Sequence, residues 1–254
     1  MSMDKISFIK KYKRIFLFGC SFTHYYWDTW ADILQHDVNI VNPSIEIYNY
    51  GVPASSNKGI ARRVLEANIL HNFTEDDAVL IVWTSWSREE RYKNRWIRTG
   101  NIYNKDPKFA KNYWNPEHEF IQNSIAIVST NNFLKEKLIL QGHMIQPDIK
   151  HYKLSVKQEI VNFYLPHLKI NLPSFDSHQT YKNSSDLHPT VLDHINFVTN
   201  NIFNLEEETQ LYYKKYHANL IEIFRSNRNG VQNPDCLEKV ENLSLKNRKH
   251  KEFY

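Results

Sequence analysis

The stretch that decides the fold is Ile15-Phe16-Leu17-Phe18-Gly19-Cys20-Ser21-Phe22-Thr23. Its first four residues are apolar, which is typical of a buried parallel strand, and they are followed by a glycine, a small residue and Ser21. The apolar residues from Trp27 to Leu34 then follow the spacing of a helix. A serine at such a strand-to-helix turn is displayed at the carboxyl edge of a sheet, beside free backbone N–H groups. This position makes Ser21 a candidate nucleophile.

Two more strands are predicted downstream, over 45–50 and 78–83, with a helix between them that Ser55 or Ser56 caps and that runs to Leu70. The strand at 78–83 is continuously apolar, as expected when both faces of a sheet are covered. The alternation of strands and helices predicts an α/β protein. We expect three α/β/α layers around a mostly parallel, five-stranded sheet.

The segment 87–115 has little periodicity and is rich in Arg, Asn, Tyr and Trp. We expect an irregular insertion there, either a substrate-facing flap at the active-site edge or a surface excursion packed on its own aromatic residues. Within it, Glu89-Glu90 and the adjoining arginines indicate a solvated charge cluster.

The second half of the chain reads mainly as helix. The predicted elements are a helix over 116–141, a short strand over 143–146, a helix over 190–203 with Pro189 in its first turn, a helical pattern over 205–226 and a break at 227–234. We therefore divide the chain into a domain over 1–203 and a helical C-terminal extension over 204–254 that ends in a basic tail at 246–251.

Composition excludes several classes of protein. Of the 254 residues, 41% are hydrophobic and 14% aromatic, which is enough for a large core and excludes global disorder. No apolar run approaches the roughly 18–20 residues that span a bilayer, and the charged N-terminus lacks a secretion signal. Cys20 and Cys236 make neither a disulfide framework nor a zinc motif. We expect a cytoplasmic protein with no metal and no cofactor.

The formal net charge is +4, and the charges are dispersed rather than gathered in a stripe. A solvated surface explains this pattern better than nucleic-acid binding does. We therefore expect no nucleic-acid partner and no membrane partner.

Far downstream, Asp186-Leu187-His188-Pro189 places a carboxylate and an imidazole close together in a predicted loop. Serine, then acid, then histidine is one of the chain orders in which a catalytic triad occurs. Together with Ser21, this motif suggests a serine hydrolase or an acyltransferase. Cys20, beside Ser21, is expected to be a small buried residue rather than a thiol nucleophile.

Over residues 14–203 the chain resembles the SGNH hydrolases, also called GDSL-type esterases, which have a flavodoxin-like three-layer fold. Gly19-Cys20-Ser21 stands where the family has its Gly-Asp-Ser block, and Asn49-Tyr50-Gly51 stands where it has a glycine after the second strand. Asp186 and His188 precede a helix, as the acid and base of the family do.

The resemblance implies that Ser21 is the nucleophile, His188 the base and Asp186 the orienting acid. It implies an oxyanion hole made by the N–H groups of Ser21 and Gly51 and a side-chain amide from a third block. That block departs from the family, because residues 83–88 contain no asparagine. The replacement donors that we consider, with Ser85 and Asn57 ranked equally, are Ser85, Asn57 and the charged Arg88.

The acid also lies two residues before the histidine instead of three, a spacing that resembles the polysaccharide O-acetyltransferase branch of the superfamily. We predict an esterase or deacylase that removes an O-acyl group from a carbohydrate or another small ester. The alternatives are a glycan O-acetyltransferase and a catalytically degenerate SGNH domain that acts as a binding module. The candidate substrate contacts are Trp86, Arg88 and His194, the last of which can equally be structural.

Aromatic residues gather in and around the insertion, where they can form either a sugar-stacking platform or core and flap packing. They are Trp83, Trp86, Trp96, Tyr103, Tyr113 and Trp114.

Overall fold

The computed structural model describes residues 4–136, 140–145, 156–168, 180–181, 188–226 and 230–244, with residues 140–145 as backbone only. Its main sheet has the strand order β2-β1-β3-β6, and all neighbouring strands are parallel. The strands are β1 (Arg14–Gly19), β2 (Glu46–Gly51), β3 (Asp77–Trp83) and β6 (Leu140–Ile145). The fifth strand that we expected is not among the described residues.

This strand order is the doubly wound, flavodoxin-like order, and it fixes where a ligand can bind. β1 pairs with β2 on one side and with β3 on the other, so the connections that follow β1 and β2 run over opposite faces of the sheet. In open α/β sheets, ligands bind in the crevice at such a switch point, outside the carboxyl ends of the strands. Ser21 follows β1 and therefore lies at the switch point.

The two faces of the sheet carry separate apolar clusters because successive side chains of a strand point in opposite directions. Ile15 and Leu17 of β1 belong to one cluster, and Phe16 and Phe18 belong to the other. Both faces are thus buried, which explains the continuous apolar runs in the sequence.

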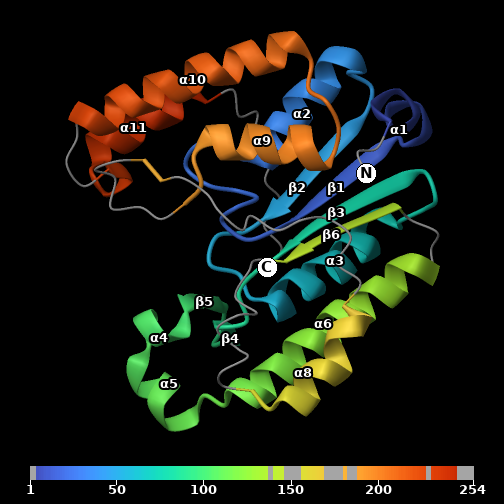
Figure 1. The fold of residues 1–254 in the computed structure, drawn as a ribbon, viewed down its shortest axis with the longest axis vertical. Coiled ribbons are helices and arrows are strands. Elements are labelled where there is room, and N and C mark those ends of the chain that lie inside the picture. The colour runs from blue at the N-terminus through green and yellow to red at the C-terminus, as the bar shows by residue number, and fades with distance from the viewer. Residues whose placement is uncertain are drawn as a thin grey trace.

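Helices cover both faces (Figure 1). The first face carries α1 (Lys5–Lys11), α2 (Trp30–Val41), α9 (Val191–Asn201), α10 (Glu207–Ser226) and α11 (Pro234–Leu243). The second carries α3 (Asn57–His71), α6 (Pro116–Glu136) and α8 (Gln158–Tyr164), and a 3₁₀ turn (Leu165–His167) follows α8.

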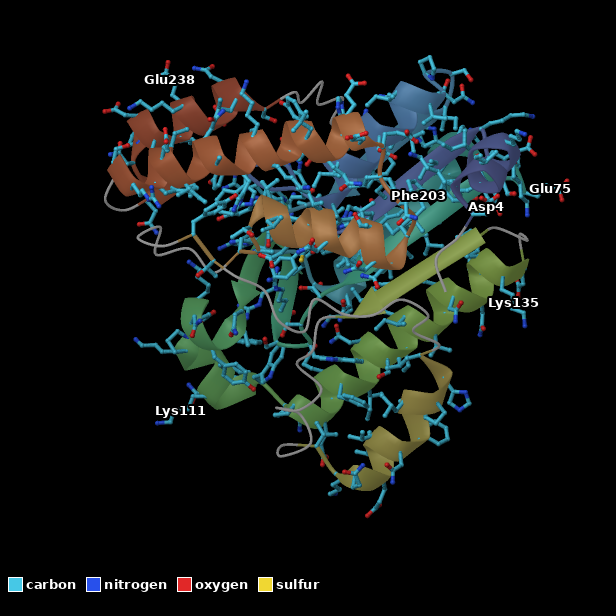
Figure 2. All side chains as sticks on the ribbon, turned by 45° about the horizontal axis from the view of Figure 1, so that its top comes forward. Asp4, Glu75, Lys111, Lys135, Phe203 and Glu238 are labelled. Carbon is cyan, nitrogen blue, oxygen red and sulfur yellow. The ribbon has the colours of Figure 1, made fainter. Side chains whose placement is uncertain are left out.

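The C-terminal helices share the core of the first face. Leu220 and Phe224 of α10 and Val240 of α11 are buried in the same cluster as Ile15 and Leu17. Figure 2 shows Phe203, which precedes α10, near Asp4 at the start of the chain, and its ring lies 5.8 Å from that of Phe8. The segment that we separated as an extension therefore packs as part of the α/β/α body.

The segment 87–115 is more regular than we expected. It forms an antiparallel hairpin of β4 (Arg88–Tyr92) and β5 (Trp96–Asn101), then α4 (Ile102–Lys105) and α5 (Pro107–Tyr113). The prediction of an irregular insertion was wrong because these strands are short and consist largely of charged and polar residues, so they carry little apolar periodicity. The hairpin and the two helices lie beyond the carboxyl ends of the sheet strands (Figure 1), and Lys111 of α5 lies at the opposite end of the molecule from Glu75 (Figure 2).

Several predicted boundaries also need correction. The helix after the first strand, α2, begins at Trp30 rather than at Trp27, because Thr29 and Asp32 form its capping box. The helix predicted over 116–141 ends at Glu136, and residues 140–141 already belong to β6. Pro189 lies before the α9 N-cap, Thr190, rather than in its first turn. After the predicted break, α11 stands where we expected only a charged tail, and residues 246–251 lie outside the described residues.

Candidate active site

Residues 20–29, which we call the nucleophile loop, connect β1 to α2. The loop begins as a tight turn in which the N–H groups of Thr23 and His24 both donate to the carbonyl of Cys20, at 2.9 and 3.1 Å. Ser21 is 4% exposed, and no described residue accepts a hydrogen bond from its N–H. Cys20 is fully buried, as expected of a small core residue. The candidate nucleophile thus lies just under the surface at the switch point.

Two glycines at the sheet edge, Gly19 and Gly51, leave room for the nucleophile loop to pack closely against the strands. A Cβ on Gly19 would lie 2.0 Å from Thr23 Oγ1, and one on Gly51 would lie 2.8 Å from Thr23 Cβ. The side chain of Thr23 therefore occupies the space that these residues leave between the ends of β1 and β2. The Val52 N–H donates to the Gly19 carbonyl at 3.1 Å and closes the same edge. Glycine is required at both positions because the Thr23 side chain approaches the backbone too closely to leave room for a Cβ.

Asn49, to which we assigned no role, links β2 to the nucleophile loop. Its Nδ2 donates to the Thr23 carbonyl at 3.0 Å, and its Oδ1 accepts the Gly51 N–H at 2.9 Å. The Gly51 N–H that we expected in the oxyanion hole therefore already has an acceptor. It becomes available to a substrate only if the Asn49 side chain moves.

The two candidate replacements for the missing asparagine differ in environment. Asn57 is fully buried and grips the backbone of Thr84: its Nδ2 donates to the Thr84 carbonyl at 3.0 Å, and the Thr84 N–H donates to its Oδ1 at 2.7 Å. Ser85 is 7% exposed, and its hydroxyl is paired with that of Ser87 at 2.7 Å. Asn57 thus holds the loop after β3 in place, whereas Ser85 lies on that loop. Arg88 is half-buried at the start of β4.

His188 lies against the nucleophile loop. Its half-buried ring stacks on the ring of Tyr25, with centroids 3.7 Å apart and planes at 19°, and the edge of Phe22, the residue after Ser21, lies 5.8 Å away. Trp27 Nε1 donates to the carbonyl of Pro189 at 3.0 Å and so fixes the backbone beside His188. The structure thus brings the candidate base to the loop of the candidate nucleophile, over a sequence separation that spans most of the chain.

The third predicted member, Asp186, lies outside the described residues. Asp193, the nearest described carboxylate downstream of His188, is engaged at the start of α9. Its Oδ2 accepts hydrogen bonds from the N–H and the hydroxyl of Thr190, at 3.0 and 2.6 Å.

Two of the predicted substrate contacts lie in the core. Trp86 is fully buried and stacks on Phe120 with centroids 4.7 Å apart, and His194 is 1% exposed on α9. Trp83 and Trp114 are buried as well, which favours packing as their role. Of the aromatic residues in the insertion, Tyr92, Tyr103 and Tyr113 are exposed, by 67%, 48% and 76%.

The hairpin is anchored beside the Gly51 loop by Glu90, which is a correction to the solvated charge cluster that we expected. Its buried carboxylate accepts the Ser56 N–H at 3.0 Å and lies 3.7 Å from Arg63 Nη1. Arg63 also donates to Ser55 Oγ at 2.6 Å, and burial lowers its pKa to about 10 against the opposing effect of Glu90. Gly59 is required here because a Cβ would lie 2.0 Å from a Glu90 oxygen.

The end of the nucleophile loop is held by the C-terminal helices through Asp28, which is 1% exposed. The Tyr213 hydroxyl donates to Asp28 Oδ2 at 3.2 Å, the Ser244 hydroxyl donates to Oδ1, and the Asp28 N–H donates to the Tyr216 hydroxyl at 3.4 Å. Burial, and secondly the Asp28 charge, raise the pKa of both tyrosines, which therefore stay protonated. No sequence signal marked this contact beyond the helical periodicity of α10.

No group of three or more His, Cys, Asp or Glu side chains in the described part of the chain could hold a metal ion. No helix among those residues is long and apolar enough to cross a membrane.

No protein-family model matches the chain, and no curated protein sequence matches it. Solved structures similar to it include a catalytic mutant of an acetylxylan esterase from Geobacillus stearothermophilus, at 13% identity over 72% of this chain and 89% of the other, with a TM-score of 0.41. A protein of the G-D-S-L family from Desulfitobacterium hafniense has 16% identity over 72% and 93%, with a TM-score of 0.40. The esterase EstA from a Pseudoalteromonas species has 14% identity over 70% and 87%, with a TM-score of 0.38. Because these TM-scores are below 0.5, the similarity carries no argument about function.

Proposed function

We propose that the protein is a serine esterase or deacylase of the SGNH type, with Ser21 as nucleophile, His188 as base and Asp186 as the orienting acid. The single observation that carries the proposal is the His188 ring packed on the nucleophile loop, beside the residue that follows Ser21. A serine at the switch point and an imidazole on the same loop are the two groups that acyl transfer requires. The proposal needs neither a metal nor a cofactor.

In the proposed reaction, Ser21 Oγ attacks the carbonyl carbon of the ester and its proton passes to the His188 imidazole. The bond from that carbon to the alcohol oxygen breaks, and the leaving oxygen takes the proton from His188. Water then attacks the acyl-serine and gives a proton to His188, which returns it to Ser21 Oγ as the carboxylic acid leaves. Each half of the cycle therefore ends with neutral His188. The first half leaves Ser21 acylated, and the second restores its free hydroxyl, so the complete cycle leaves the enzyme unchanged.

The negative oxygen that forms on the carbonyl carbon needs hydrogen-bond donors, each worth about 2.7–4 kcal/mol of barrier. The Ser21 N–H is the first candidate because no described residue occupies it. The Ser85 hydroxyl is the second candidate because it lies on the loop after β3, where the family places its amide. Asn57 supports this arrangement indirectly, through its two hydrogen bonds to Thr84.

The substrate that we propose is an O-acyl ester of a carbohydrate or another small alcohol. The exposed rings of Tyr103 and Tyr113, on the segment beyond the carboxyl ends of the strands, support a sugar because aromatic faces bind apolar ring faces well. Trp86 and His194 take no part in this proposal, since both are buried.

Hydrolysis of p-nitrophenyl acetate and labelling by a fluorophosphonate test the proposal. Wild-type protein and the Ser44→Ala variant, which changes an exposed serine at the opposite end of the sheet, should turn over and be labelled equally. The Ser21→Ala variant should do neither. Turnover that depends on an added sugar acceptor would instead indicate an acetyltransferase.

A binding module without chemistry is the second candidate, and the engaged Gly51 N–H favours it. A degenerate site can lose its oxyanion donors while it keeps its fold and its ligand. Folded wild-type protein that is not labelled at Ser21 would establish this candidate over the esterase.

A further inference from the structure

Three aromatic rings of the nucleophile loop surround the imidazole of His188. Tyr25 is parallel to it at 3.7 Å, and the edges of Phe22 and Trp27 approach it at 5.8 and 6.4 Å. The nucleophile loop, which carries Ser21, thus also contacts His188 through the aromatic rings of Phe22, Tyr25 and Trp27. In the proposed triad, the same task of orienting the base belongs to Asp186.

The Tyr25 ring is itself held in place. Trp27 meets it edge-on at 4.7 Å and 83°, and Tyr26 meets it at 4.9 Å and 62°. Trp27 is fully buried, is bonded through Nε1 to the Pro189 carbonyl, and packs edge-on against Tyr181 at 5.3 Å. The Tyr25 ring on which His188 stacks is therefore supported by Tyr26 and Trp27, and Trp27 is in turn held by residues far away in the sequence, Tyr181 and Pro189.

We propose that Tyr25 is a positioning residue for His188, an inference that rests on the function proposed above. A face-to-face stack covers one face of the imidazole and leaves both ring nitrogens pointing outward in the ring plane, where a hydroxyl and a carboxylate can reach them. The face of an aromatic ring also attracts a cation, so the stack favours the imidazolium that forms as Ser21 attacks. Tyr25 sets the plane of the base, and the acid sets its rotation within that plane.

A positioning role for Tyr25 predicts a different pattern of substitution effects from that of a residue that only fills space. If the ring face is what matters, phenylalanine replaces tyrosine fully and leucine, which is apolar but has no π face, does not. Substrate binding should be untouched, since the stack acts on a group that changes charge during the chemical step. The loss should therefore fall on kcat and leave KM unchanged.

The experiment measures p-nitrophenyl acetate kinetics for the wild type, Tyr25→Phe, Tyr25→Leu and Phe163→Leu, a matched change at an exposed aromatic residue on α8. We expect Tyr25→Phe and Phe163→Leu to stay within about twofold of the wild type, and Tyr25→Leu to lose about tenfold in kcat at constant KM. Thermal unfolding of each variant shows whether it is folded. Unchanged kcat in folded Tyr25→Leu, or an equal loss in Tyr25→Phe, overturns the proposal.

A second measurement separates this inference from the proposed function. Proton NMR of the His188 ring reports the stack without any reaction, because the Tyr25 ring current moves the imidazole resonances upfield. Tyr25→Phe should keep that shift and Tyr25→Leu should abolish it. If Tyr25→Leu leaves the shift unchanged, the stack is refuted whatever the activity. Wild-type protein that shows the shift but is as inactive as Ser21→Ala refutes the esterase, and with it the positioning role.

Discussion

At the scale of single residues, the proposed chemistry depends on Ser21 and on His188, which lies 167 residues later in the sequence and packs on Phe22 and Tyr25 of the nucleophile loop. The proposed proton transfer requires these two groups to come within hydrogen-bond reach of each other. Thr23, Gly19 and Gly51 keep the loop in position at the sheet edge.

The first prediction is that Ser21 and His188 act as a unit. Ser21→Ala and His188→Ala should each lower kcat by roughly 10³–10⁶, since either change stops proton transfer, and Asp186→Asn should cost less. Steady-state kinetics with p-nitrophenyl acetate measures the losses. Full activity of Asp186→Asn would remove that residue from the mechanism.

At the scale of elements, the hairpin β4–β5 is attached to the start of α3 by one buried carboxylate. Glu90 meets the Ser56 N–H and lies near two arginines, with Arg62 Nη2 at 3.6 Å and Arg63 Nη1 at 3.7 Å. Its neighbour Glu89 lies 3.9 Å from Lys58, which belongs to the same helix. The carboxylate of Glu90 is therefore buried against the start of α3, whereas that of Glu89 makes only a long ionic contact among the described residues. The sequence gives no signal that distinguishes these two glutamates.

The second prediction compares these two glutamates. Glu90→Gln should lower the free energy of unfolding by on the order of 3 kcal/mol, because it removes the carboxylate beside the buried guanidinium of Arg63. Glu89→Gln should leave stability equal or higher, since burial raises the pKa of Glu89 and its ionised form is therefore disfavoured in the folded protein. Urea unfolding measures both variants, and equal losses would contradict the assignment.

The third prediction concerns pH and the packing of α10. Burial lowers the pKa of His36 on α2 and of His217 on α10, so the folded protein disfavours the protonated imidazoles. The unfolded chain binds those protons near pH 6.5, and the stability is therefore full above that value and declines as the pH falls through it.

The double variant His36→Gln/His217→Gln should show a flatter fall in unfolding free energy between pH 7.5 and 5.5 than the wild type. His167→Gln, at an exposed histidine after α8, serves as the control and should keep the wild-type slope. An unchanged slope in the double variant would show that other groups cause the acid sensitivity.

At the scale of the whole molecule, the C-terminal helices and the nucleophile loop form one structure. Asp28 and Tyr213, 185 residues apart in sequence, share a buried hydrogen bond, and Ser244 after α11 binds the same carboxylate. The cluster on the first face of the sheet runs from Phe8 to Val240. We therefore expect the ends of the chain to affect the site.

The fourth prediction follows from this connection. Tyr213→Phe should lower the free energy of unfolding by about 1–3 kcal/mol, because it leaves a buried carboxylate oxygen short of a donor, and it should also lower turnover through the loop. Tyr212→Phe is the matched control, since its half-buried hydroxyl makes only a long contact of 3.4 Å to the Leu243 carbonyl. Equal effects in the two variants would argue against a special role for Asp28.

The sequence alone determined the sheet strands at 14–20, 45–50 and 78–83 and the helices that follow the first two, because apolar runs, glycines and caps are local signals. It also placed Ser21 at the sheet edge and His188 before a helix. Only the tertiary structure decided that Tyr25 stacks on His188, that Asn49 occupies the Gly51 N–H, and that Glu90 and Asp28 are buried. Contacts between side chains far apart in sequence depend on how the layers pack, and a single sequence carries no local signal of that packing.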